Sequence, residues 1–234
     1  MIHLTFDQDW APAWATRAVL DIVTQANCKA TFFVTHDCPS LSDLRTSGRF
    51  ELAWHPNFLP GSSHGDTIEE VLAYLAQIVP EAQGARAHTL IRGTPFLQAY
   101  GARGLHYDAA DLHDGIHGLS VFQSWTGLLR IPIFFEDDVH LQRGLPLDAA
   151  ALELERPGLK VLSFHPVLLA LNAVELGSYE ALKANLSARG IGLTEASPDD
   201  FAPYLPKAGP GVRDLLTVVA PRCRGGFLRE ITVS

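Results

Sequence analysis

The sequence predicts an α/β fold in which helices cover a parallel β-sheet or β-barrel. Apolar runs with strand character alternate along the chain with amphipathic segments of helical period, as in repeated β–α units. Polar residues able to perform chemistry fall at or just after the C-terminal ends of these runs, where parallel β–α folds build their sites. We therefore expect one domain over residues 1–234, with a site at one rim.

The individual elements follow from these patterns. Residues 12–27 are typical of a helix, because one face carries Val19, Leu20, Ile22 and Val23. Asp66 is the expected N-cap of a later helix, with Glu69 at capping-box spacing. The expected strands are 2–6, 29–35, 50–56, 85–90, 105–111, 128–138 and 160–166. The expected helices are 12–27, 66–80, 94–104, 146–158 and 178–190.

Composition narrows the classes of partner. The formal net charge of −8 argues against nucleic acid or anionic lipid, which both require a basic surface, and favours a small-molecule or saccharide substrate. The three cysteines, Cys28, Cys38 and Cys223, have no CxxC spacing and favour a reducing compartment. We find no basic leader and no apolar run long enough to span a membrane, so a cytoplasmic location is expected.

The strand ends gather carboxylates and imidazoles. Asp7 and Asp9 end the first strand two residues apart, so their side chains point to one side. Two like charges this close require a cation or a shared proton. A divalent metal of the zinc type suits such a set of ligands. The strand-end residues are Asp7, Asp9, His36, Asp37, His55, His88, Asp137, Asp138 and His165.

Four motifs in order, LTFDQDW, ATFFVT, FELAWHPNF and LSFHP, resemble those of the NodB-type polysaccharide deacetylases of carbohydrate esterase family four. The resemblance extends to the WbmS-like branch, which is found with surface-polysaccharide biosynthesis. It implies a distorted (β/α) barrel of about seven parallel strands. It also implies hydrolysis of N-acetyl groups from amino sugars, with a divalent metal, for which zinc is expected, held by one aspartate and two histidines.

The resemblance assigns roles to individual residues. The first aspartate of the opening motif corresponds to Asp7, the general base, and the second to Asp9, a metal ligand. Gln8 separates them, whereas adjacent aspartates are more common in the family. The segment ELAWH matches the strand that carries the first histidine ligand, which makes His55 that ligand.

The second histidine ligand departs from the family pattern. It normally follows the first by four residues, where this chain has Leu59. Two replacements remain open, His64 in a loop and His88 at a strand end, and we favour His88. In the family an arginine on the corresponding strand orients the catalytic aspartate. Arg86 matches it, and strand alternation directs His88 to the same side.

The last motifs supply the acid. LSFHP resembles the final motif of the family, which makes His165 the residue that protonates the departing amine. FFEDD resembles the acidic segment that supports the arginine or the base. Asp138 is the candidate we place in the site, with Asp137 as the alternative.

Other interpretations stay open at this stage. The aspartates could be turn or cap residues, and a lone histidine is often only structural. Trp10, beside the acidic pair, could stack on a sugar ring. For the whole chain, the alternatives are a ring-opening or other C–N amidohydrolase of the same superfamily, or a catalytically silent barrel that binds carbohydrate or metal.

Overall fold

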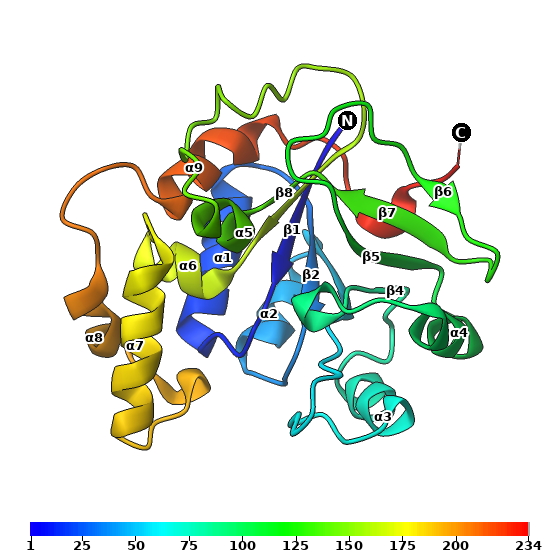
Figure 1. Ribbon diagram of the computed structural model, residues 1–234, viewed down its shortest axis with the longest axis horizontal. Coiled ribbons are helices and arrows are strands. Elements are labelled where there is room, and N and C mark those ends of the chain that lie inside the picture. Colours follow the sequence, from blue (N-terminus) through cyan, green and yellow to red (C-terminus); the bar gives the residue numbers. More distant parts are fainter. Residues whose placement is uncertain (234) are drawn as a thin grey trace.

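The computed structural model describes residues 1–233. Its centre is a sheet in the order β6-β7-β5-β4-β3-β2-β1-β9-β8, seen near the middle of Figure 1. All neighbouring pairs are parallel except β6 and β7. The strands are β1 Ile2–Asp7, β2 Ala30–Val34, β3 Phe50–Trp54, β4 Gly84–Ala85, β5 Tyr107–Leu112, β6 Phe122–Gln123, β7 Leu129–Ile133, β8 Phe135–Glu136 and β9 Lys160–Phe164.

The sheet is a distorted barrel, as predicted. Strand β8 is at one end of the strand order and β7 is next to the other end, yet only Phe134 separates them in the chain. The first half of this segment pairs with β5 and the second with β9, and the backbone N–H of Phe134 donates to the carbonyl of Val161 at 2.9 Å. If β7 and β8 are counted as one continuous strand, the parallel strands are β1 to β5, the combined β7–β8 strand and β9. The sheet then has the seven parallel strands that were expected.

Helices and 3₁₀ turns surround the strands. In Figure 1, α6, α7, α8 and α9 lie on one side of the sheet and α3 and α4 on the other. No helix within residues 1–233 is long and apolar enough to cross a membrane. The α-helices are α1 Ala13–Gln25, α2 Ser40–Thr46, α3 Ile68–Ile78, α4 Thr94–Ala102, α5 Asp137–Gln142, α6 Pro166–Leu171, α7 Leu176–Ala188, α8 Pro198–Phe201 and α9 Val212–Val219. The 3₁₀ turns are His88–Leu90, Leu193–Glu195, Ala202–Tyr204, Ala220–Arg222 and Leu228–Glu230.

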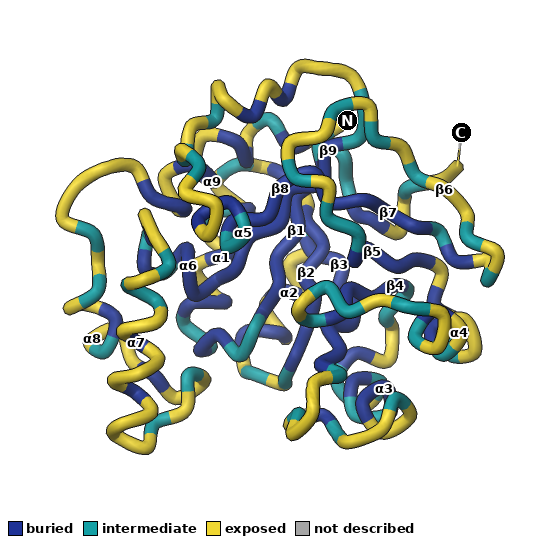
Figure 2. Tube along the Cα trace, viewed as in Figure 1, coloured by how far each residue is buried: buried dark blue, intermediate teal, exposed yellow. Residues whose placement is uncertain are grey.

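Strand alternation divides the buried side chains between two regions. One face of the strands packs apolar rings and aliphatic groups under the helices, as shown by Phe6 against Phe32 and Phe164. The other face is more polar and includes Asp7, Arg86 and His165, which are all buried. Figure 2 shows the central strands buried and the outer surfaces of the helices exposed. The polar interior therefore points toward one rim of the barrel.

The C-terminal segment closes the opposite end of the barrel. The backbone N–H of Leu228 donates to Thr31 Oγ1 at 3.0 Å, and that of Arg229 donates to Glu51 Oε2 at 3.1 Å. Glu51 is buried and also accepts from the hydroxyl of Tyr107 at 2.9 Å. Burial raises the pKa of Glu51 despite these donors. This end of the barrel is therefore filled, and the carboxyl ends of the strands are left for a site.

Three sequence predictions are corrected. Residues 146–158 form successive turns rather than a helix, because their backbone bonds reach back only two or three residues, as from Ala151 to Asp148. The N-cap of α3 is Thr67, whose hydroxyl accepts from the N–H of Glu70 in a full capping box, and not Asp66. The strand predicted at 85–90 is shorter, since β4 ends at Ala85 and a 3₁₀ turn begins at His88.

Candidate metal and catalytic site

The end of β1 carries the aspartate pair. Asp7 is the last residue of the strand, and Asp9 and Trp10 follow in the left-handed region with φ of 44° and 55°. Non-glycine residues pay a steric cost there, which persists when surrounding contacts fix the backbone. Gln8 supplies such contacts, because its buried Oε1 accepts from the backbone N–H groups of Thr35 and His36 at 2.9 and 3.1 Å. Gln8 thus fixes the turn that presents Asp9 to the site.

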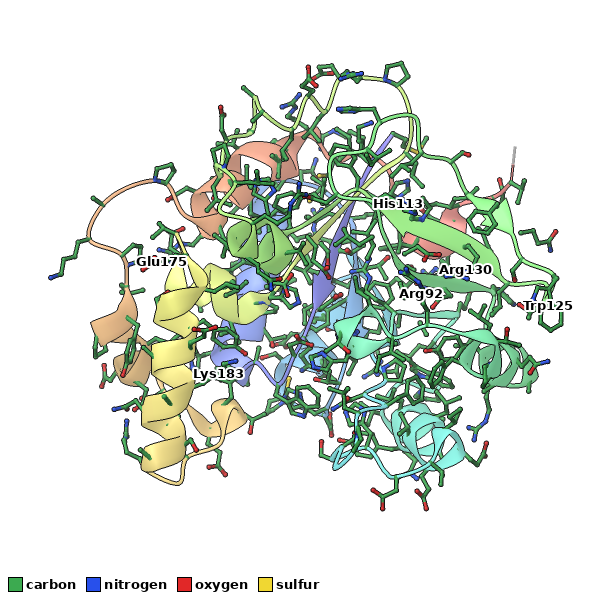
Figure 3. All side chains as sticks on the ribbon, viewed as in Figure 1. Arg92, His113, Trp125, Arg130, Glu175 and Lys183 are labelled. Carbon is green, nitrogen blue, oxygen red and sulfur yellow. The ribbon has the colours of Figure 1, made fainter. Side chains whose placement is uncertain are left out.

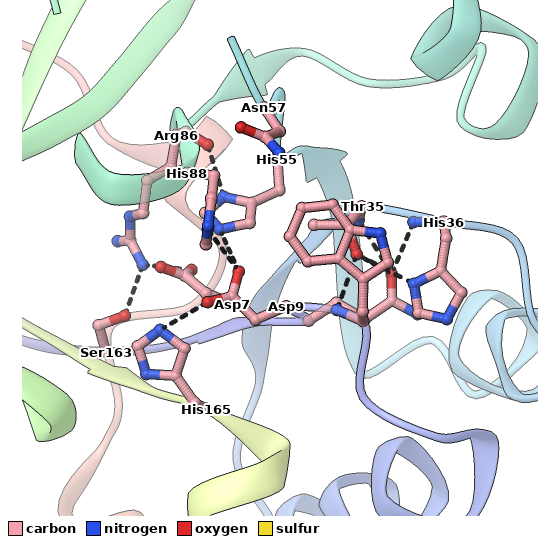
Figure 4. A network of polar contacts seen from close by, with 12 residues as sticks. Asp7, Asp9, Thr35, His36, His55, Asn57, Arg86, His88, Ser163 and His165 are labelled. Atoms are coloured by element: carbon pink, nitrogen blue, oxygen red, sulfur yellow. Dashed lines mark hydrogen bonds and ion pairs between the residues drawn. The ribbon is translucent and has the colours of Figure 1, made fainter. Parts of the chain in front are cut away.

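Asp9 lies between two imidazole rings (Figure 4). Its Oδ1 is 2.9 Å from His55 Nε2 and 2.9 Å from His88 Nδ1. Burial raises the pKa of Asp9, but the two imidazoles outweigh burial and hold it well below its ordinary value. These three residues offer ligand atoms that all lie within 4.8 Å of one another, so they form a group that could hold a metal ion.

The tautomer of His55 suits a metal ligand. Its Nδ1 lies 2.6 Å from the carbonyl oxygen of Arg86, and since a carbonyl can only accept, Nδ1 carries the proton. Nε2, 2.9 Å from Asp9 Oδ1, is then the ring nitrogen left to bind a metal. Metal-binding histidines characteristically donate their other N–H to a carbonyl or carboxylate in this way. The buried His55 therefore has the chemistry of a preformed ligand.

His88 reaches the group from the segment after β4. The backbone N–H groups of Arg86 and His88 donate to the carbonyls of Trp54 and Pro56, at 3.0 and 2.9 Å. This strand-like alternation continues past the end of β4 and sends both side chains to the site. The ring of His88 meets Trp10 edge-on at 5.2 Å. Burial lowers the pKa of His88, but the hydrogen bond and charge of Asp9 outweigh it and raise the pKa overall.

Asp7 is held by a buried arginine. Arg86 Nη1 donates to Asp7 Oδ1 at 2.7 Å, to Ser163 Oγ at 2.7 Å and to Thr5 Oγ1 at 3.0 Å. Arg86 Nε donates to the carbonyl of Ala109 at 2.9 Å. Arg86 is fully buried, and its charge is compensated by Asp7. Only one oxygen of Asp7 takes part in these contacts.

His165 and Asp137 form a second pair. Asp137 Oδ1 lies 2.6 Å from His165 Nδ1, and its Oδ2 accepts from the backbone N–H of His165 at 2.9 Å. His165 Nε2 lies 3.5 Å from Asp9 Oδ2, so the ring faces the metal-ligand group. Burial lowers the pKa of His165, but the charges of Asp137 and Asp138 outweigh burial and raise it well above its ordinary value.

The two alternatives in the acidic segment thus occupy different places. Asp137 contacts His165, whereas Asp138, the residue placed in the site from the sequence, lines the pocket without bonding to that ring. The chain turns from strand to helix between Glu136 and Asp137, which is why strand alternation could not decide between them. Sequence reasoning also missed Glu136, a buried pocket residue.

A pocket of about 200 Å³ joins these groups. His64 is not among the residues that line it. His64 Nδ1 accepts from the backbone N–H of Asn57 at 3.2 Å, and its ring stacks on Tyr74 at 4.8 Å. The pocket is lined by Asp7, Asp9, His55, Ala87, His88, Thr89, Leu90, Glu136, Asp138, Val139 and His165.

Three of the strand-end residues also lie outside this pocket: Asp137, which contacts His165 instead, and the neighbours His36 and Asp37. His36 and Asp37 are not among its lining residues, and Thr35 Oγ1 lies 3.0 Å from His36 Nδ1. Arg92 and Arg130, labelled in Figure 3, both pair with Asp111, and none of the three lines this pocket.

The fold and site define a class of protein, a distorted α/β barrel with carboxylates and imidazoles clustered at the carboxyl ends of its strands. Residues 4–183 match the WbmS-like polysaccharide deacetylase family. Because this match covers more than half of the chain, the protein belongs to that family, and the resemblance inferred from its motifs is confirmed. A search of curated proteins found no match to the sequence.

The chain is similar to several solved structures. The structure of a Bordetella bronchiseptica protein described as a candidate polysaccharide deacetylase involved in O-antigen biosynthesis is similar, with a TM-score of 0.82 and 29% identity. That match covers 95% of this chain and 90% of the other. A family 4 carbohydrate esterase from Streptomyces lividans in complex with acetate has a TM-score of 0.47 and 15% identity, covering 85% and 93% of the two chains. A family 4 acetyl xylan esterase from Clostridium thermocellum in complex with a cobalt ion has a TM-score of 0.44 and 15% identity, covering 85% and 94%.

Proposed function

We propose that this protein is a metal-dependent hydrolase that removes the N-acetyl group from an amino sugar. One observation carries the proposal: a carboxylate facing two imidazoles, Asp9 with His55 and His88, lies in the same pocket as the separately held Asp7 and His165. An amide requires a polarised carbonyl, an activated water and a protonated leaving amine, and this arrangement has a group for each task.

Asp9, His55 and His88 are the proposed metal ligands. One carboxylate and two neutral imidazoles suit zinc, with further positions open to water and substrate. The hydrogen bond from His55 Nδ1 to the carbonyl of Arg86 supports this assignment, because it leaves Nε2 as the ligand atom. When bound, the metal would supply Lewis-acid activation of the acetamide carbonyl and of water.

Asp7 is the proposed general base. Arg86 and its hydroxyl partners hold one oxygen of Asp7, and the other oxygen is the one able to take a proton from the attacking water. Fixing a carboxylate by a buried guanidinium also fixes its direction, which matters because proton transfer requires hydrogen-bond distance. Arg86 is therefore a positioning residue in this account.

His165 is the proposed general acid. Asp137 holds Nδ1, so Nε2 is directed toward the pocket and can deliver a proton to the departing amine. The raised pKa of His165 keeps the ring protonated near neutral pH, as an acid requires. Attack of water on the amide gives a tetrahedral oxyanion. As this species collapses, the C–N bond breaks and His165 protonates the departing nitrogen.

The substrate proposed is an N-acetylated saccharide or saccharide precursor. The similar Bordetella protein is described as acting in O-antigen biosynthesis, which supports a surface-polysaccharide precursor. In the cytoplasmic location expected from the sequence, that precursor would be nucleotide- or lipid-linked. The pocket of about 200 Å³ is small, and it favours engagement of a single sugar unit at the reacting centre.

The test is acetate release from a panel of N-acetylated amino sugars, nucleotide-linked sugars and short saccharides. The protein is stripped with a chelator and assayed before and after addition of zinc. We expect acetate only after metal is restored. If the chelator-treated protein releases acetate equally well with and without added zinc, the proposed role of the metal is wrong. Bound metal without acetate release from any sugar would favour a silent binding barrel, and hydrolysis of cyclic amides alone would favour the ring-opening amidohydrolases.

A further inference from the structure

Glu136 is a buried carboxyl group in the reaction pocket that the steps above do not use. It is the last residue of β8, paired with Ser163 of β9, and only 4% of it is exposed. It lines the pocket together with Asp7 and His165, and the ligand-type atoms of these three residues all lie within 4.8 Å of one another. Glu136 therefore lies next to both the proposed base and the proposed acid.

We propose that Glu136 is a substrate-binding residue whose carboxyl O–H donates a hydrogen bond to a sugar oxygen beside the reacting amide. The inference rests on the proposed function and adds a contact that helps to select the substrate. The oxygen must be an acceptor within reach of both Asp7 and His165, which describes a hydroxyl or ether oxygen next to the acetamido group on the sugar ring.

The charges around Glu136 support a neutral carboxylic acid. Arg86 compensates Asp7 through a 2.7 Å contact, and His165 compensates Asp137 at 2.6 Å. No comparable cation contacts Glu136 among residues 1–233, and a buried carboxylate without a partner is costly. Burial, with repulsion from Asp138 and Asp7, outweighs the attraction of His165 and Arg86 and raises the pKa of Glu136 well above its ordinary value.

Its hydrogen-bonding capacity is also unused. Within the described chain, no side chain or backbone group bonds to the carboxyl of Glu136, although every other carboxylate of the inner site has a partner: Asp7 has Arg86, Asp9 has His55, and Asp137 has His165. A buried polar group normally finds a partner. Because Glu136 lines the pocket, a substrate oxygen is the partner that its position allows.

The test compares Glu136→Gln with Glu136→Leu. Glutamine is neutral, has nearly the same shape and keeps an N–H donor, whereas leucine keeps the bulk without a donor. We expect Glu136→Gln to stay within about threefold of wild type in kcat and KM. Glu136→Leu should raise KM about tenfold with little change in kcat, as for a hydrogen bond made equally in ground and transition states.

A second measurement is independent of turnover. Infrared difference spectra of wild type minus Glu136→Gln at pH 7 should contain the C=O band of a protonated carboxyl group. Its absence, or an equal loss of kcat in both variants while the fold stays intact by thermal unfolding, would overturn the assignment and point to an anionic role. If wild type releases no acetate from any sugar, the proposed function fails, whereas the infrared band still decides the state of Glu136.

Discussion

His55 Nδ1 donates to the backbone carbonyl of Arg86 at 2.6 Å, while the side chain of that same arginine holds Asp7 at 2.7 Å. One residue thus orients the proposed metal ligand with its backbone and the proposed base with its guanidinium. The two tasks are coupled by one fully buried residue directly after β4. Disturbing either contact is expected to affect the two tasks differently.

Replacing Arg86 should destabilise the fold as well as the site. Arg86→Met leaves Asp7 as a buried charge without its partner, so we expect the free energy of unfolding to fall by about 3–5 kcal/mol in urea denaturation. The double variant Arg86→Met/Asp7→Asn should recover part of that loss. Arg17→Ala, which breaks an exposed pair with Asp43, is the control and should cost at most about 1 kcal/mol. Equal losses in the two single variants would contradict the account.

Asp137 should control the protonation of His165. Because Asp137 raises the pKa of His165, Asp137→Asn should lower it, so activity that needs the protonated ring is lost at a lower pH than in wild type. We also expect kcat to fall by at least about tenfold. The pH profile of kcat/KM checks this. Asp138→Asn is the matched control. It should shift the alkaline limb of the kcat/KM profile less than Asp137→Asn does, since Asp138 makes no bond to His165. A larger shift in Asp138→Asn would show that Asp138, and not Asp137, controls His165.

Replacing His88 should lower the metal content of the protein, whereas replacing His64 should not. His88→Ala removes one of the three proposed metal ligands, so zinc stoichiometry after dialysis should fall several-fold. His64→Ala should retain the metal, because His64 is engaged with the backbone of Asn57 and with Tyr74. Plasma emission spectrometry on both variants provides the measurement. Loss of metal in His64→Ala alone would restore the alternative left open by the sequence.

His3 should make stability depend on pH. It is buried at the closed end of the barrel, its Nδ1 lies 3.2 Å from the carbonyl of Gly226, and burial lowers its pKa to about 4. The unfolded chain binds a proton near pH 6.5 and the folded chain does not, so stability from this group is complete above pH 6.5 and is lost as the pH falls toward 4. When the pH is lowered from 7.5 to 5, the free energy of unfolding measured in urea should fall by about 2 kcal/mol less for His3→Gln than for wild type. Identical losses would show that His3 is accessible to protons in the fold.

Most of the strands and most of the long helices could be predicted because their apolar residues follow a strand or helix period, whereas the short strands β4 and β6 could not. Phe6 and Phe164 alternate with polar residues along their strands, and this alternation also directs Asp7 and His165 inward. Residues 146–158 were mispredicted because their alanine- and leucine-rich composition favours a helix, whereas turns between Pro146 and Pro157 satisfy their backbone.

The site was predictable where alternation continued and unpredictable where the chain changed direction. The side chains of His88 and Arg86 lie on the same side because the backbone N–H groups of both residues donate to β3 and the residues that follow it. This pairing continues even though β4 ends at Ala85. Glu136 and Asp137 lie on either side of a strand-to-helix turn, so neither orientation follows from period. Glu136 comes directly before the two aspartates in the sequence, and this position was a signal that it could belong to the site. Its buried environment, however, arises only from strands distant in sequence.

The metal content and activity of two variants test the central claim most directly. Asp7→Asn should bind zinc at nearly the wild-type stoichiometry and release no detectable acetate, because it removes the base and keeps the ligands. His55→Ala should lose both metal and activity. Equal loss of metal in the two variants, or full metal binding by His55→Ala, would contradict the assignment of Asp9, His55 and His88 as the metal centre with Asp7 as a free carboxylate beside it.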